Sequence, residues 1–321
     1  MQKKPYVLGL DMGGTNSVLG VVDARGHVLA RTSIRTQSFP EINDYVNALY
    51  EEALKIVDSV GGMDLIRGIG AGVPNGNYYT GMIEGAMNLP WQSVPFAQLM
   101  TDRFGIPCKI TNDANAAAMG EMTYGAARGM KNFIMITLGT GVGSGFVANG
   151  EMIYGHDGFA GEFGHVIVER GGRQCGCGRR GCLESYTSAG GIKRTAFELM
   201  AIMNDPSPIR EYSFDQLEAA MLSKFALEGD PIAKECFRLT GQKLGYALAD
   251  AVTITSPEAI FLFGGLAKAG NLIFDPIKHY MEENMLITFK NKVKVLPSEL
   301  QDKNAAILGA AALVWQAKQT A

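Results

Sequence analysis

The sequence predicts an α/β protein built from two lobes of similar design. Residues 6–22 and 133–148 share one layout, in which an apolar strand, a turn rich in glycine and threonine, and a second apolar strand follow one another. Through the rest of the 321 residues, segments with helical spacing of apolar side chains alternate with short apolar runs. This repetition indicates a duplicated α/β lobe with a cleft between the copies.

The first copy is expected to open with a hairpin whose strands cover residues 6–10 and 17–22, joined by a polar turn at 11–16 that we call the first tip. The elements expected after it are a helix at 41–60, a strand at 66–73, a helix at 96–104, a strand at 107–111 and an Ala-rich helix at 114–124. Asn112 and Asp113 stand where this last helix begins and would cap it.

The second hairpin has strands at 133–138 and 144–148, and its turn at 139–143 is called the second tip. The later elements expected are helices at 190–203, 214–228 and 231–255, a buried strand at 259–263 and a closing helix at 305–316. We place the lobe boundary near Asn112, so that residues 1–112 with 302–321 form the small lobe and 113–301 the large lobe. The closing helix then packs back on the small lobe.

Composition excludes several classes of partner. The 29 Lys and Arg residues nearly balance 32 Asp and Glu, the net charge is −3, and the chain lacks a basic run that could follow a phosphate backbone, so no nucleic acid is expected as a partner. No apolar stretch approaches the roughly 20 residues that span a bilayer. With no signal peptide ahead of the first strand, we expect a cytoplasmic protein with no membrane partner.

The two tips carry groups that suit phosphate. The first tip offers backbone N–H groups and a hydroxyl at Gly13, Gly14 and Thr15, next to the carboxylate of Asp11, which could hold Mg²⁺. The second tip offers the same kind of backbone, and its residues are Gly139, Thr140 and Gly141. Either tip alone could be an ordinary glycine hairpin turn. Two facing tips are what a nucleoside triphosphate in a cleft would need.

Two further glycine patterns need separate interpretation. The second tip comes close to a dinucleotide-binding fingerprint, but it lies between two strands, lacks the third glycine and opens no helix, which disfavours a dehydrogenase. Gly264 and Gly265 follow the buried strand at 259–263 and could form a flat floor for adenine. Plain strand-to-helix turn chemistry explains that pair equally well.

One histidine and three cysteines have the spacing of a closed Cys₃His zinc site. They are His165, Cys175, Cys177 and Cys182. Chance placement, a disulfide or a redox pair are the alternatives, although an odd total of five cysteines and the absence of a signal peptide disfavour a disulfide. A structural Zn²⁺ here would also fix the direction of two neighbouring carboxylates, Glu162 and Glu184.

Asp113 can have two roles at once. A carboxylate at a helix N-terminus satisfies free N–H groups, and it can also accept a proton from a hydroxyl nucleophile during phosphoryl transfer. Asn112 and Asp113 offer donors and acceptors suited to vicinal sugar hydroxyls. The same holds for Asn88, Glu162 and Glu184, so a polyol substrate is expected.

Taken together, five motifs resemble the ROK family of repressors, open reading frames and kinases, and within it the bacterial kinases that act on glucose. The motifs lie at residues 10–16, 111–117, 138–143, 158–165 and 175–184 and are spread over nearly the whole chain. The resemblance implies a two-lobed actin-like ATPase (ribonuclease H-like) fold that closes on ATP, Mg²⁺ and a hexose. It also implies transfer of the γ-phosphoryl group to the sugar 6-hydroxyl and, by analogy with similar kinases, a homodimer.

The resemblance assigns roles residue by residue. Asp113 becomes the catalytic base. The sugar ligands implied are Gly76, Asn88, Asn112, Asp113, Glu162, His165 and Glu184. The zinc ligands implied are His165, Cys175, Cys177 and Cys182, and the nucleotide-binding residues are Asp11, Gly13, Gly14, Thr15, Gly139, Thr140, Gly141, Gly264 and Gly265. His165 could serve metal and sugar through its two ring nitrogens.

Glucose is the substrate favoured by this resemblance. N-acetylmannosamine, N-acetylglucosamine, fructose and allose stay open, because these sugars differ from glucose by one substituent or stereocentre that the motifs do not read. A regulator that binds sugar without turnover would be expected to lose the base or the phosphate tips. Asp11, Asp113 and both tips are intact, which favours an enzyme.

Overall fold

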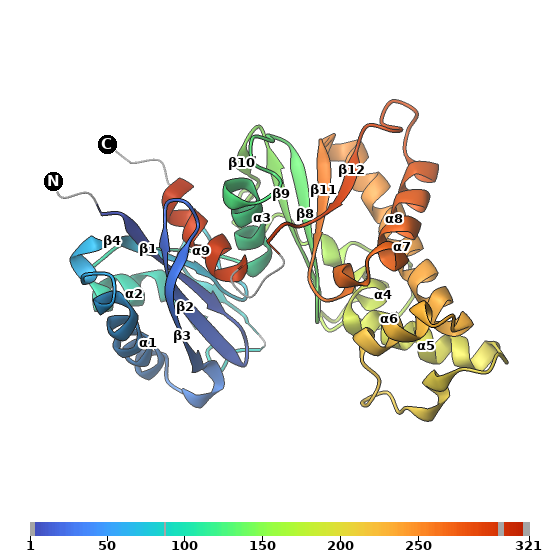
Figure 1. The fold of residues 1–321 in the computed structure, drawn as a ribbon, viewed down its shortest axis with the longest axis horizontal. Helices are drawn as coiled ribbons and strands as arrows, with labels where there is room; N and C mark the ends of the chain where they lie inside the picture. The colour runs from blue at the N-terminus through green and yellow to red at the C-terminus, as the bar shows by residue number, and fades with distance from the viewer. Residues whose placement is uncertain (1–3, 87, 301–304, 317–321) are drawn as a thin grey trace. The chain divides into compact units, whose positions relative to one another are not determined.

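The computed structural model describes residues 4–86, 88–300 and 305–316 (Figure 1). The chain divides into two compact units. Unit 1 comprises Met1–Met130, Met152–Ala160 and Glu299–Ala321, and unit 2 comprises Lys131–Glu151 and Gly161–Ser298. Each unit is built around its own five-stranded sheet.

The sheet of unit 1 has the strand order β3-β2-β1-β4-β7. Its strands are β1 (Tyr6–Met12), β2 (Asn16–Asp23), β3 (Val28–Arg35), β4 (Ile66–Gly72) and β7 (Cys108–Thr111). The first three strands are antiparallel, whereas β4 and β7 run parallel to β1. The register pairs Gly72 with Asp11 on one side and with Thr111 on the other, so the carboxyl ends of three strands share one edge.

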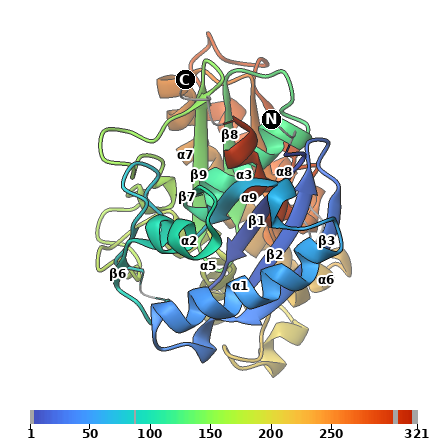
Figure 2. The ribbon, with the colours of Figure 1, turned by 90° about the vertical axis from the view of Figure 1, so that its left-hand side faces the viewer.

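Helices cover this sheet on both faces. They are α1 (Ile42–Asp58), α2 (Phe96–Phe104), α3 (Asp113–Tyr124) and α9 (Ala305–Gln316), and a small hairpin of β5 (Ile83–Glu84) and β6 (Ser93–Val94) precedes α2. Helix α1 lies across the strands in Figure 2 and packs on β2 and β3. Helix α9 packs on β1 and β4, and α3 packs on α9, so the closing helix lies in unit 1.

The sheet of unit 2 repeats the design, with strand order β10-β9-β8-β11-β12. Its strands are β8 (Phe133–Leu138), β9 (Val142–Ala148), β10 (Glu151–Met152), β11 (Ala259–Phe263) and β12 (Lys294–Pro297). Strands β8 and β9 are antiparallel, while β11 and β12 run parallel to β8 as β4 and β7 do to β1. The duplication predicted from the two hairpins is therefore confirmed by the matching strand orders.

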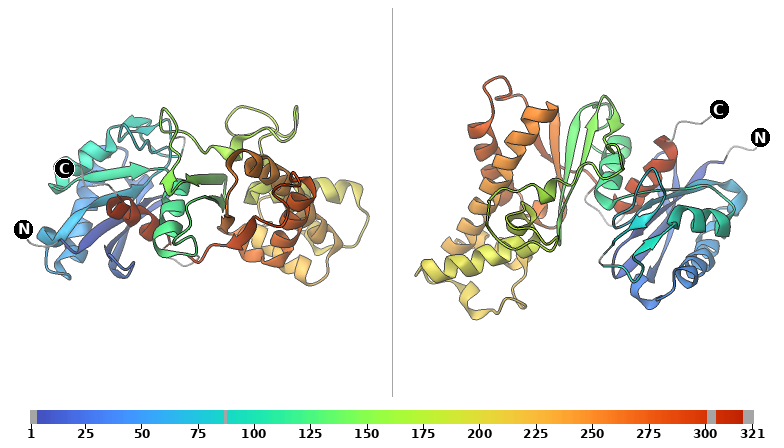
Figure 3. Two further views of the ribbon diagram at one scale, coloured as in Figure 1. Left: turned by 90° about the horizontal axis from the view of Figure 1, so that it is seen from above. Right: turned by 180° about the vertical axis from the view of Figure 1, so that it is seen from behind.

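One large core joins this second sheet to its helices. Figure 3 shows the ribbon of these helices from above and from behind. The helices are α4 (Glu184–Thr187), α5 (Ala189–Ile202), α6 (Ala219–Leu227), α7 (Pro231–Thr255) and α8 (Asn271–Asn284). Short 3₁₀ turns lie at Thr36–Ser38, Met63–Leu65, Phe163–His165, Pro208–Glu211 and Leu266–Ala269. Helix α7 contacts α4, α5, α6 and α8 and is the centre of this layer. Among the described helices, none is long and apolar enough to cross a membrane.

The structure departs from the sequence-based expectation in several places. The helix predicted over 214–228 begins at Ala219, and strands β3 and β12 were not predicted. Every second residue of β3 is exposed, which is why its sequence shows little apolar signal. The division also differs from the boundary predicted near Asn112, since α3 belongs to unit 1. A Cβ on Gly120 of α3 would lie 2.9 Å from the Cα of Gly309 in α9, so the two helices touch backbone to backbone.

Candidate active site

The carboxyl ends of β1, β4 and β7 gather the chemistry of unit 1. Asp11 lies near the end of β1, and Asn112 and Asp113 directly follow β7. Asn112 caps α3, because its Oδ1 accepts the N–H of Asn115 at 2.7 Å. Asp113 is the first helical residue, and its own Oδ1 accepts the N–H of Ala114 at 2.9 Å. The cap is thus Asn112 alone, which corrects the expectation that Asp113 caps the helix.

The two carboxyl groups at this edge, those of Asp11 and Asp113, both have raised pKa values. The protein atoms packed around Asp113 raise the pKa of its carboxyl group above the ordinary value, against the lowering effect of the Ala114 hydrogen bond, although the side chain still reaches solvent. The pKa of Asp11 rises from 3.8 to about 6, first through burial and second through the negative charge of Asp113. Perturbed carboxyl groups at the carboxyl edge of an α/β sheet are typical of functional sites. This pair could bind a cation and accept a proton.

The first tip contacts Asn88, which is one of the residues predicted to bind the sugar. The N–H of Gly13 donates to the carbonyl of Asn16 at 2.9 Å, which closes the tip. A Cβ on Gly14 would lie 3.0 Å from the carbonyl oxygen of Asn88 and 3.1 Å from its Nδ2, so the tip rests against Asn88. A Cβ on Gly76 would lie 2.7 Å from the carbonyl oxygen of Thr111, next to the β7 end of the site. Unit 1 therefore contains eight of the predicted site residues, which are Asp11, Gly13, Gly14, Thr15, Gly76, Asn88, Asn112 and Asp113.

The second tip joins β8 to β9 in unit 2. The N–H of Gly139 donates to the carbonyl of Gly141 at 3.0 Å, and the carbonyl of Gly139 accepts the N–H of Ala189, the first residue of α5, at 2.9 Å. Gly264 has φ of +103°, and a Cβ there would lie 2.5 Å from the carbonyl oxygen of Leu138, the last residue of β8. Only glycine suits this position. The predicted glycine floor thus adjoins the predicted second tip.

Glu184, at the start of α4, lies between the second tip and the cysteines. Its Oε2 accepts the N–H of Val142 at 3.0 Å, and the same atom would lie 2.4 Å from a Cβ on Gly141. Its Oε1 is 3.7 Å from the Sγ of Cys175. The carboxylate retains lone pairs for a ligand beyond these contacts, since each carboxylate oxygen accepts more than one hydrogen bond.

The predicted metal ligands form one cluster. Single ligand atoms of His165, Cys175, Cys177 and Cys182 all lie within 4.8 Å of one another. A tetrahedral site with bonds of about 2.1–2.3 Å has edges of about 3.4–3.8 Å. The distance from His165 Nδ1 to Cys175 Sγ is 3.7 Å, and that from Cys177 Sγ to Cys182 Sγ is 3.6 Å. These atoms suit a tetrahedral thiolate metal site.

All five cysteines are free, and the Cys177–Cys182 separation is far beyond the roughly 2.05 Å of an S–S bond, so the disulfide alternative is wrong. His165 turns Nδ1 toward the cluster, which leaves Nε2 for another ligand. Glu162 is exposed and stands just before the 3₁₀ turn Phe163–His165, where its carbonyl accepts the N–H of His165 at 3.0 Å. The same turn therefore carries one predicted metal ligand and one predicted sugar ligand.

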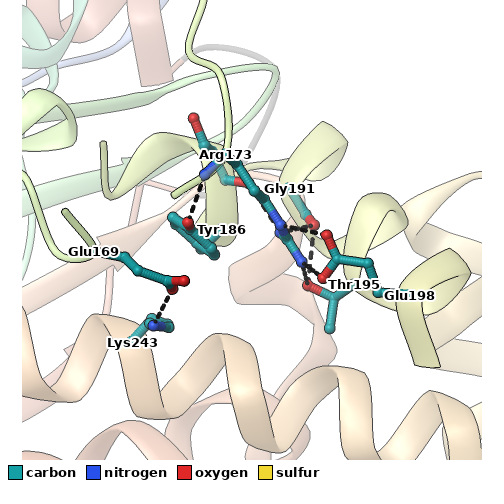
Figure 4. A network of polar contacts seen from close by, with 8 residues as sticks. Glu169, Arg173, Tyr186, Gly191, Thr195, Glu198 and Lys243 are labelled. Carbon is teal, nitrogen blue, oxygen red and sulfur yellow. Dashed lines mark hydrogen bonds and ion pairs between the residues drawn. The ribbon is translucent and has the colours of Figure 1, made fainter. Parts of the chain in front are cut away.

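A network behind α4 was not predicted from the sequence (Figure 4). Arg173, two residues before Cys175, donates from its backbone N–H to the hydroxyl of Tyr186 at 2.8 Å. Its guanidinium donates to the carbonyls of Ser185 and Gly191, each at 3.0 Å. The same guanidinium pairs with Glu198 and lies 4.5 Å from the centre of the Tyr186 ring.

Lys243 completes this network, because its Nζ lies 5.0 Å from the same ring and 2.7 Å from a carboxylate oxygen of Glu169. Together these side chains line a pocket of about 480 Å³. The network ties the cysteine loop to α4, the helix that begins with Glu184. Arginine and tyrosine flanking the cysteine motif were the only sequence signal for it.

Comparison with known proteins places the chain in a family. The sequence profile of the ROK family matches residues 7–317. A glucokinase of Streptomyces coelicolor is 34% identical over 319 residues, covering 95% of this chain and 96% of the relative. The crystal structure of a ROK family glucokinase from Streptomyces griseus, solved in complex with glucose and AMPPNP, superposes with a TM-score of 0.78 at 32% identity, covering 97% of this chain and all of the other.

A putative xylose repressor of a Caldicellulosiruptor species is 28% identical, covering 96% of this chain and 77% of the relative. Kinases and repressors are thus both among the relatives. The structural match also confirms the predicted two-lobed fold of the actin-like ATPases. On the profile match over nearly its whole length, this chain belongs to the ROK family.

Proposed function

We propose that this protein is an ATP-dependent hexose kinase that transfers the γ-phosphoryl group of ATP to the 6-hydroxyl of glucose, giving glucose 6-phosphate. The observation that carries the proposal is Asp113, a carboxyl group at the start of α3 that is open to solvent, has a raised pKa and is close enough to Asp11 to raise the pKa of that group too. The glucokinase relatives and the glucose and AMPPNP in the Streptomyces griseus structure support this substrate pair.

In this mechanism Asp113 is the general base. The 6-hydroxyl oxygen forms a bond to the γ-phosphorus, the bond from that phosphorus to the β–γ bridging oxygen breaks, and ADP leaves with the electron pair. The hydroxyl proton passes to Asp113, whose raised pKa makes it a stronger base than an aspartate of ordinary pKa. Asn112, fixed by its capping bond, would orient the sugar beside it.

The nucleotide would be held by backbone N–H groups of the two tips, with adenine on Gly264 and Gly265. Asp11 would hold Mg²⁺, which supplies positive charge to the phosphates when bound. The cysteine cluster suits Zn²⁺ in a structural role, because its four ligands close the coordination shell. The cluster would then hold His165 and, through the Cys175 contact, Glu184 in place for the sugar.

The sugar would be bound by Gly76, Asn88, Asn112, Glu162, His165 and Glu184. N-acetylmannosamine, N-acetylglucosamine, fructose and allose are the alternative substrates, because one substituent or stereocentre separates them from glucose. The similarity to a putative xylose repressor supports a second candidate function, that of a regulator that binds sugar without turnover. We also predict that the protein is cytoplasmic and that it forms a homodimer. Light scattering on the purified protein would check the dimer.

The deciding experiment measures ADP release with ATP and Mg²⁺ against glucose, mannose, fructose, allose and the two N-acetylhexosamines. We expect fast turnover on glucose, with the Asp113→Asn variant as the control that removes the base. Fast turnover on another sugar instead would reassign the substrate. Sugar binding by calorimetry without turnover on any sugar would support the regulator and reject the kinase.

A further inference from the structure

A row of three buried hydroxyl groups connects α1 to the first tip. The hydroxyl of Tyr45 lies 2.6 Å from the Oγ of Ser17, and this Oγ lies 2.8 Å from the Oγ1 of Thr36. The Oγ1 of Thr36 donates to the carbonyl oxygen of Gly13 at 2.8 Å. All three side chains are fully buried. We call this row the hydroxyl relay.

The direction of every bond in the relay follows from counting protons. A carbonyl oxygen can only accept, so the single hydroxyl proton of Thr36 points at Gly13. Thr36 must therefore accept from Ser17, which in turn must accept from Tyr45. Burial raises the pKa of Tyr45 far above its ordinary value, so this phenol keeps its proton at neutral pH. Each bond polarises the next in such a chain.

The end of the relay acts on the geometry of the tip. Besides the bond to the Gly13 carbonyl, the backbone N–H of Thr36 donates to the carbonyl of Thr15 at 2.9 Å. In a trans peptide the C=O and the following N–H point in opposite directions. Because Thr36 holds the Gly13 carbonyl inward, the N–H of Gly14 is turned away from Thr36. Gly14 is also the residue that rests against Asn88.

We propose that Tyr45, Ser17 and Thr36 are positioning residues for nucleotide binding, which orient the Gly14 N–H toward a phosphate group. This inference rests on the proposed kinase function, since it presumes that the first tip binds phosphate. None of the three side chains is itself placed against substrate. They act through the Gly13–Gly14 peptide, which would otherwise be free to rotate in a flexible Gly-Gly turn.

The test compares single-group changes. Thr36→Val and Tyr45→Phe each remove one hydroxyl with little change of shape, and Thr36→Ser keeps the hydroxyl. Thr101→Val is the matched control, because the hydroxyl of Thr101 also donates to a carbonyl in unit 1, that of Ala97 at 2.7 Å, and also accepts a bond, from the N–H of Cys108 at 3.1 Å. Titration calorimetry gives the Kd of ADP with Mg²⁺, and kinetics give KM for ATP. Thermal unfolding is followed in parallel.

We expect Thr36→Val to weaken ADP binding and raise KM for ATP about tenfold, Tyr45→Phe to do so by a smaller factor, and Thr36→Ser to restore values within about twofold of the parent protein. Thr101→Val should lower the melting temperature but leave both nucleotide constants unchanged. Nucleotide constants that stay at the parent value in Thr36→Val would overturn the relay, even if stability falls. The binding of ADP tests the relay even if the protein has no turnover. The kinase proposal is tested separately, and it would be refuted if the parent protein turned over none of the sugars.

Discussion

Replacing Asp11 by asparagine should make the folded protein more stable while removing activity. A carboxyl group whose pKa rises on folding destabilises the native state increasingly as the pH rises above its unfolded pKa, and this destabilisation is complete once the pH exceeds its native pKa. For a rise from 3.8 to about 6, the destabilisation is at most about 3 kcal/mol at pH 7.5 and about 1 kcal/mol at pH 4.5. Asparagine has nearly the same shape and no charge to bury, so Asp11→Asn should regain that energy.

The assay is thermal unfolding of the parent protein and of Asp11→Asn at several pH values, without nucleotide. At about 2–4 °C per kcal/mol for domains of 150–250 residues, the variant should melt at most roughly 6–12 °C higher at pH 7.5, with a much smaller gain at pH 4.5. Turnover should fall sharply, because Asp11 would no longer hold Mg²⁺. A variant that melts at or below the parent temperature at pH 7.5, or gains equally at both pH values, would refute the electrostatic reasoning.

Three further predictions concern the other parts of the site. Asp113→Asn should preserve folding and sugar binding yet lower kcat by at least about a hundredfold, and near-normal turnover would reject Asp113 as the base. Purified protein should contain about one Zn²⁺ per chain by elemental analysis, and stripping it with a chelator should weaken sugar binding and lower stability; metal-free protein with full activity would contradict this. Arg173→Lys should remove the guanidinium hydrogen bonds to the carbonyls of Ser185 and Gly191, lowering stability by about 1–3 kcal/mol and raising KM for the sugar more than it lowers kcat. Arg180→Lys on the exposed wall of the same pocket is the control, and equal effects of the two changes would contradict the role given to Arg173.

The parts of the site that could be predicted from sequence are those with a local signature. The cysteine cluster needs four residues within 18 positions of one another, and their spacing alone indicated the group of potential ligand atoms that the structure brings together. Asp113 was recognisable because a strand, an Asn-Asp pair and an Ala-rich helix follow directly along the chain. Both tips were recognisable because glycine and threonine interrupt apolar strands.

The parts that escaped prediction depend on residues far apart in the sequence. Ser17 lies 28 positions from Tyr45 and 19 from Thr36, and they meet only because α1 packs on β2 after the chain has formed β3 between them. Strand β3 is itself hard to recognise, since half its residues face solvent. The relay thus depends on an element that the sequence hides, and no spacing rule could have related its three hydroxyls.

The two tips also show what could not be predicted from the sequence. Their sequences are alike and both follow the first strand of a matching sheet, yet the structure supports them differently. The first tip is held from below by the hydroxyl of Thr36, whereas the second is held by the carboxylate of Glu184 on the N–H of Val142 and by α5 on the carbonyl of Gly139. The hydroxyl of Thr36 that supports the first tip is uncharged. The negative charge of the first tip is therefore that of its own residue Asp11. The carboxylate at the second tip is linked instead to the cysteine cluster, so loss of metal should disturb the second tip first and leave the relay intact.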